Sequence, residues 1–61
     1  MTTYIVWNKE SEYLVNSESP IRAIQSVISI TDTFACDWNI SRLDDYSFKA
    51  QAKIRSNAIT L

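Results

Sequence analysis

Neither a disulfide nor a metal can cross-link this chain of 61 residues, because it has a single cysteine and no histidine. A domain this small buries little apolar surface, and disulfides, metals or self-association often add the missing stability. Cys36 is the only cysteine, so no intrachain disulfide is possible. There is no histidine, which leaves a structural zinc site almost without ligands. We therefore expect no metal and no cofactor, and we expect stability to come from self-association or from a partner.

The charge and hydropathy of the chain exclude several classes of partner. Six Lys and Arg against seven Asp and Glu give a net charge of −1, which argues against general attraction to nucleic acid or anionic lipid. An apolar content of 46% is too high for a disordered tail. No apolar run approaches the roughly 20 residues that span a bilayer, and residues 1–8 do not resemble a signal peptide. We expect a cytoplasmic protein without membrane association.

Two strands and a helix are expected in the first half of the chain. Residues 3–7 and 12–16 are rich in β-branched and aromatic side chains, and the polar residues between them predict a hairpin loop of about three residues. Ser19 is suited to cap a helix, and Pro20 to occupy its first position. Apolar residues at three- and four-residue steps then predict an amphipathic helix that ends near Thr31.

Alternation of apolar and polar residues predicts two further strands in the second half. The period of two runs through residues 34–41 and again through residues 46–55. Cys36 and Trp38 then lie on the buried face of the third strand, where Cys36 is interpreted as a small core hydrophobe and Trp38 as a core aromatic residue. Residues 55–61 are expected to form a loose C-terminal tail.

These segments predict one α+β domain over residues 1–61, with the element order β-β-α-β-β. A chain of this length has room for one four-stranded, mainly antiparallel sheet with a single helix packed on one face. We favour the spatial order second, first, third and fourth strand, because it makes every pair of neighbours antiparallel. The absence of glycine implies that Asn or Asp takes any position with positive φ.

Large apolar side chains on both faces of the first hairpin predict a protein interface. With a three-residue loop, Trp7 and Tyr13 would share one face of the sheet, and Leu14 would lie on the other. One helix covers only one face, so some of these side chains would be exposed, as they usually are at interfaces. The expected interface residues are Tyr4, Val6, Trp7, Tyr13 and Leu14.

Basic residues suggest a second kind of site. Lys49, Lys53 and Arg55 would share the solvent side of the last predicted strand, where they could contact RNA or DNA phosphates. The competing interpretation is an ordinary solvated face, whose lysines discourage edge-to-edge strand pairing. The negative net charge favours this second interpretation, so nucleic-acid binding is the alternative function.

No set of residues suggests catalysis. Histidine, the usual general base at neutral pH, is absent, and a nucleophilic Cys36 would need such a base. The adjacent Asp44 and Asp45 are ordinary for a turn between strands. We expect a non-catalytic protein-binding module that associates with itself or with another protein.

Two resemblances bear on this expectation. The strand pair followed by Ser19-Pro20-Ile21-Arg22-Ala23-Ile24 resembles a pattern in very small proteins of phage and prophage genomes, over residues 3–28. Such proteins often inhibit a host enzyme or defence component, so the resemblance implies a stoichiometric inhibitor in the host cytoplasm. In element order after the first strand, the chain is also similar to the flavin-storing dodecins, from which it differs by a shorter helix and by the position of Trp38 within a strand.

Overall fold

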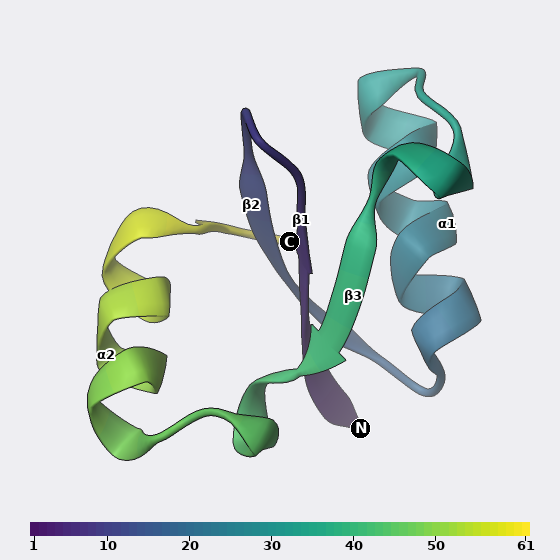
Figure 1. Cartoon of the computed structure of the whole chain (residues 1–61). Coiled ribbons are helices and arrows are strands. Elements are labelled where there is room, and N and C mark those ends of the chain that lie inside the picture. Colours follow the sequence, from purple (N-terminus) through teal and green to yellow (C-terminus); the bar gives the residue numbers. More distant parts are fainter.

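The computed structural model describes residues 1–61 and shows a four-stranded mixed sheet with helices on its two sides (Figure 1). The strands are β1 (Thr2–Trp7), β2 (Glu12–Ser17), β3 (Asn39–Arg42) and β4 (Ile59–Thr60). The helices are α1 (Pro20–Thr31), α2 (Phe48–Asn57) and two single-turn 3-10 helices, η1 (Ala35–Asp37) and η2 (Leu43–Asp45). The α+β class and a mainly antiparallel sheet with a helix on one face are confirmed, whereas the order of elements differs from β-β-α-β-β.

The first hairpin forms where the sequence predicts it, but its loop is longer. Trp7 pairs with Glu12, which leaves four residues between the strands. The side chain of Asn8 organises this loop, since its Oδ1 accepts hydrogen bonds from the backbone N–H of Glu10 (2.8 Å) and of Ser11 (2.9 Å). Because side chains alternate along a strand, the extra residue reverses the faces of β2 relative to those of β1. Trp7 and Tyr13 therefore lie on opposite faces, not on one face as predicted.

Helix α1 confirms the signals read from its sequence. Pro20 occupies the first turn, and the Ser19 hydroxyl accepts a hydrogen bond from the Arg22 N–H (3.3 Å). The helix ends at Asp32, which adopts φ 55° and donates its N–H to the Ile28 carbonyl (2.9 Å). An aspartate thus takes the left-handed position that glycine often fills at a helix C-terminus.

The strand predicted over residues 46–55 is wrong, because this segment forms helix α2. The Ser47 hydroxyl caps the helix by accepting the Ala50 N–H (3.2 Å). Most residues that follow are strong helix formers, and local propensity prevails over an alternation that contains few large apolar side chains. The expected loose tail at residues 55–61 is wrong for the same reason, since α2 continues to Asn57 and β4 follows.

The predicted third strand is real but shorter. Only residues 39–42 pair with β1, and the segment before them turns through η1. Asp37 stabilises this turn, because its carboxylate accepts the Phe34 N–H (3.2 Å). As a result, the Cys36 side chain is exposed, and the expectation of a buried Cys36 is wrong. Trp38 is buried, as predicted.

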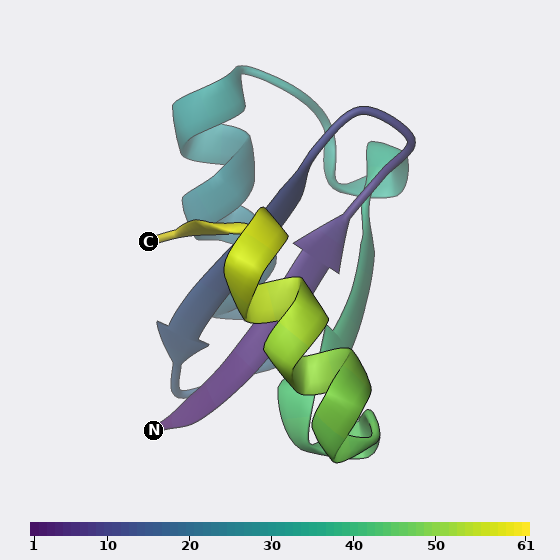
Figure 2. The same ribbon diagram turned by 90° about the vertical axis from the view of Figure 1, so that its left-hand side faces the viewer.

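The sheet order is β3-β1-β2-β4. Strand β1 is central and pairs antiparallel with both β2 and β3, as expected. The last strand does not lie beside β3, because β4 pairs parallel with β2 at Tyr13 and Leu14. Helix α2 carries the chain from the β3 edge across one sheet face to the opposite edge (Figure 2).

Each face of the sheet has its own core. On the α1 face the buried residues are Tyr4, Val6, Val15, Ala23, Val27 and Trp38. On the α2 face they are Ile5, Leu14 and Leu43, with Trp7, Tyr46, Ile54 and Ala58 packed around them. Leu43 of η2 and Ile54 of α2 both pack on this face, so the segment from η2 through α2 covers the sheet face that a single helix would have left exposed.

Candidate binding cleft

The predicted interface residues fall into two groups. Tyr4, Val6 and Leu14 are at most 3% exposed, because α1 covers the first two and the smaller core of the α2 face encloses the third. The premise that one face of the hairpin stays uncovered is therefore wrong, and a partner cannot reach these three side chains in the folded monomer. Trp7 and Tyr13 are half-buried and remain accessible.

The two accessible aromatic residues lie in different surroundings. Tyr13 packs edge-on against Trp38, with ring centroids 5.6 Å apart and an interplanar angle of 70°. It therefore belongs to the margin of the α1-face core. Trp7 lies on the opposite face, at the wall of a cleft between the sheet and α2. Of the predicted interface residues, Trp7 alone lines this cleft.

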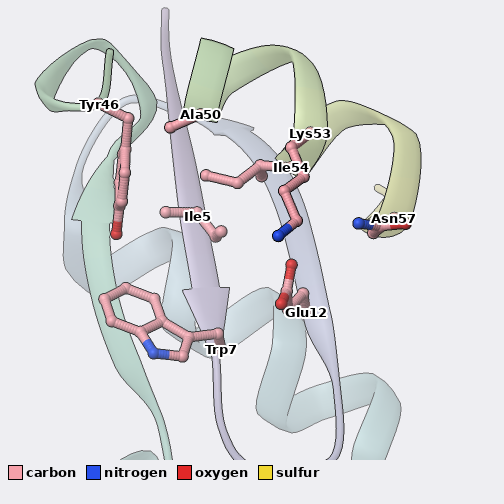
Figure 3. Close-up of a pocket in the computed structure, with 8 residues that line it drawn as sticks. All are labelled: Ile5, Trp7, Glu12, Tyr46, Ala50, Lys53, Ile54 and Asn57. Atoms are coloured by element: carbon pink, nitrogen blue, oxygen red, sulfur yellow. The ribbon is translucent and has the colours of Figure 1, made fainter.

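The cleft has a volume of about 440 Å³ and is half-open. Figure 3 shows the strand residues on one side and residues of α2 on the other. Its lining comes from β1, β2, the segment before α2 and α2 itself: Ile5, Trp7, Glu12, Tyr46, Ala50, Lys53, Ile54 and Asn57. Five of these eight residues are hydrophobic, so the interior of the cleft is mainly apolar.

Opposite charges mark one part of the cleft. The Lys53 ammonium group and the Glu12 carboxylate point toward one another from α2 and β2 (Figure 3). Both residues are exposed, so they carry their charges at the solvent boundary and not in the apolar interior. A ligand in the cleft would therefore meet aromatic and aliphatic walls, with one positive and one negative group beside them.

The indole N–H of Trp38 is hydrogen-bonded within the fold. The Trp38 indole N–H donates to the Thr33 hydroxyl (2.7 Å), which in turn is 2.7 Å from the Thr31 hydroxyl. This chain of hydrogen bonds fixes Trp38 in the core. No polar side-chain atom that is buried lacks a hydrogen-bond partner. Binding groups must therefore be sought on accessible side chains such as Trp7 and Tyr46.

The three basic residues do not form the predicted stripe. In a helix, Lys49 and Lys53 are separated by one turn and share a side, whereas Arg55 lies two residues further and points elsewhere. Lys53 turns toward the cleft (Figure 3). All three side chains are exposed. The arrangement places two lysines together and leaves the arginine apart from them.

Sequence reasoning missed most of the cleft, because it missed α2. Alternation places Tyr46, Ala50 and Ile54 on one face of a strand. The usable signal was the helical spacing of Ala50 and Ile54 behind Ser47, a favourable cap residue. Glu12 gave no signal either, because only a four-residue loop brings it onto the face of Ile5 and Trp7.

No metal site accompanies the cleft. Cys36 is exposed on η1, and no group of three or more His, Cys, Asp or Glu side chains is placed to hold a metal ion. None of the helices combines the length and the apolar character needed to cross a membrane.

Comparison of the sequence and structure with protein-family models, curated proteins and solved structures gives no significant match.

Proposed function

We propose that this protein is a small, non-catalytic protein-binding module that receives an apolar side chain of its partner in the cleft beneath α2. The observation that carries the proposal is an apolar cleft of about 440 Å³ with Trp7 and Tyr46 in its wall. Tryptophan and tyrosine contribute disproportionately to the free energy of protein binding, above all around pockets that an anchor residue fills.

The half-open shape of the cleft favours a protein partner over a small ligand. Sites for small molecules usually bury 70–90% of the ligand, whereas an open cleft suits a side chain that projects from a larger surface. Lys53 and Glu12 at its boundary can pair with charges on that surface. Such pairs contribute more to specificity and association rate than to affinity. The resemblance to small phage proteins makes a host enzyme or defence component the first class of partner to test.

Nucleic-acid binding is less well supported than protein binding. A net charge of −1 offers little attraction to phosphates, and Arg55 is separated from the two lysines on α2. Fluorescence anisotropy with short RNA and DNA at low salt provides the comparison. Salt-dependent binding at low micromolar concentration, lost in Lys49→Glu, would favour nucleic acid and contradict the proposal.

The chain offers a matched pair of substitutions for testing the cleft. Ala50 is half-buried and lines the cleft, whereas Ala52 is exposed on the same helix. Leucine has a helix propensity close to that of alanine, so Ala50→Leu and Ala52→Leu perturb the helix backbone to a similar, small degree. Only the first substitution adds three carbon atoms to the cleft.

The experiment is affinity capture with tagged wild-type protein and the two variants, after circular dichroism has shown that all three are folded. Identified partners are then measured by titration with purified protein. We expect Ala50→Leu to weaken binding at least about tenfold, which corresponds to about 1.4 kcal/mol, and Ala52→Leu to leave it unchanged. A partner that binds Ala50→Leu as tightly as wild type would refute the cleft as its site.

A further inference from the structure

The two edges of the sheet are covered to different degrees. At the β2 edge, β4 pairs with Tyr13 and Leu14, and the Leu61 N–H donates to the Leu14 carbonyl (2.8 Å). At the other edge, β3 has no strand beyond it. It is the strand nearest the viewer in Figure 1 and borders the sheet in Figure 2. An uncovered edge strand is a template for pairing with another chain.

The register shows which backbone groups of β3 face outward. The Asn8 N–H donates to the Ser11 carbonyl (3.0 Å), and this pair continues the β1–β2 register. Hydrogen-bonded pairs alternate in an antiparallel ladder. The backbone N–H and C=O groups of the even-numbered residues of β1 therefore point toward β2, and those of the odd-numbered residues point toward β3. Ile5 lies opposite Ser41 and Trp7 opposite Asn39. The backbone groups of Ile40 and Arg42 consequently point away from the sheet.

The sequence of β3 contains no proline or bulge that would block backbone pairing. Edge strands are commonly protected by shortness, charged side chains, proline, a bulge or a covering helix. Strand β3 is four residues long and ends in the charged Arg42, but it has no proline and its pairing with β1 is continuous. Both helices cover the faces of the sheet and leave this edge free (Figure 1).

We propose that the β3 edge pairs antiparallel with the β3 edge of a second copy of this chain, about a two-fold axis at Ile40. The result is a dimer with one continuous sheet. A two-fold axis makes the same surface serve both partners, so one short strand supplies both halves of the interface. The edge and the cleft consist of different residues, so this proposal stands independently of the proposed function.

Three registers pair outward-facing residues of the two strands, and charge disfavours one of them and favours the register with the axis at Ile40. An axis at Arg42 would place two arginines directly opposite each other, which is unfavourable. An axis at Ser41 would place Arg42 opposite Ile40 of the second copy. An axis at Ile40 pairs the two isoleucines and places Arg42 opposite Trp38 of the second copy, next to the carboxylate of its Asp37. The Trp38 backbone N–H already donates to the Ala35 carbonyl (3.2 Å), so the backbone pairing centres on Ile40.

The positions of these two charged residues fit that register. Arg42 pairs with Tyr4, whose side chain belongs to the core on the α1 face. Asp37 belongs to η1, which contacts α1 and so lies on the same side of the sheet. Both residues are exposed. The two-fold axis would form the contact between Arg42 and Asp37 twice, once at each end of the paired strands.

Sedimentation equilibrium on single and double charge reversals tests the pairing. We expect a wild-type dimer at micromolar to submillimolar concentration. Arg42→Asp and Asp37→Arg should each raise the dissociation constant roughly tenfold, because each creates like charges at both ends. Asp37→Arg also loses the hydrogen bond to the Phe34 N–H, so circular dichroism first checks that this variant is folded. The double variant Arg42→Asp/Asp37→Arg should return to within about threefold of wild type, because it restores the opposite charges. Arg55→Asp, the same charge change on α2, should have no effect.

Amide hydrogen exchange at two protein concentrations locates the contact within the dimer. The Ile40 and Arg42 amides should be protected only at the higher concentration, whereas the Ser41 amide, which faces β1, should be protected at both. A wild-type protein that remains monomeric at about 1 mM, a concentration at which even a millimolar dissociation constant gives a substantial fraction of dimer, would overturn the proposal. So would a dimer in which Ile40 and Arg42 exchange freely, or in which the double reversal fails to restore association.

Discussion

At the scale of single residues, the two tryptophans show how position within the fold decides the role of a side chain. Trp38 is 8% exposed, hydrogen-bonded to Thr33 and packed against Tyr13. Trp7 is half-buried beside a cleft. The sequence predicted the core position of Trp38 from alternation alone. It could not predict which residues of β2 share a sheet face with Trp7, because this depends on the length of the hairpin loop. The polar residues of that loop are compatible with several turn lengths.

Replacing each tryptophan by alanine should therefore have different consequences. Trp38→Ala should cost about 3–5 kcal/mol of folding free energy, as deletion of a large buried aromatic usually does, and leave the chain largely unfolded. Trp7→Ala should leave a folded chain that binds its partner more weakly. Urea denaturation followed by circular dichroism measures the first effect, and titration with the partner measures the second. A folded Trp38→Ala protein with native stability would contradict the assignment of Trp38 to the core.

At the scale of elements, the sequence correctly predicted a helix or strand where the cap residue, the propensity and the hydrophobic pattern all indicate the same structure. Helix α1 has a cap, a proline at its start and an apolar stripe, and its predicted bounds are those observed. Residues 46–55 carry two conflicting signals, an alternating pattern and strong helix formers behind Ser47. Helix propensity prevails in this segment, and the helix places Ile54 against the apolar sheet face that α1 leaves uncovered. The sequence indicated that one helix would leave an apolar face uncovered, but not that residues 48–57 would cover it.

The cap of α2 provides a test of this element. The Ser47 hydroxyl accepts the Ala50 N–H, so Ser47→Ala should destabilise the protein by about 1 kcal/mol. Ser56 is the matched control, because its hydroxyl only bonds back to the Ala52 carbonyl within the same helix. Ser56→Ala should be neutral or slightly stabilising. Urea unfolding of the two variants makes the comparison, and equal stabilities would show that Ser47 does not cap a helix.

At the scale of the whole molecule, α2 links the fold to the proposed function. Through Ile54 it packs on the second face of the sheet, it forms one wall of the cleft, and it leads to the strand that covers the β2 edge. The sheet order could be predicted for its first three strands, whose pairing follows from the hairpin and the apolar central strand. The position of the fourth strand could not, because it depends on the path of α2 across the sheet.

Solution NMR of the wild-type chain tests whether α2 lies over the sheet. Helical Cα chemical shifts are expected through residues 48–57, with nuclear Overhauser contacts between the side chains of Ile54 and Ile5, which both belong to the hydrophobic cluster on the α2 face. Extended chemical shifts in this segment, with cross-strand contacts between residues 46–55 and β3, would show that α2 does not form. The cleft would then not exist, and the hairpin residues on that face would be exposed.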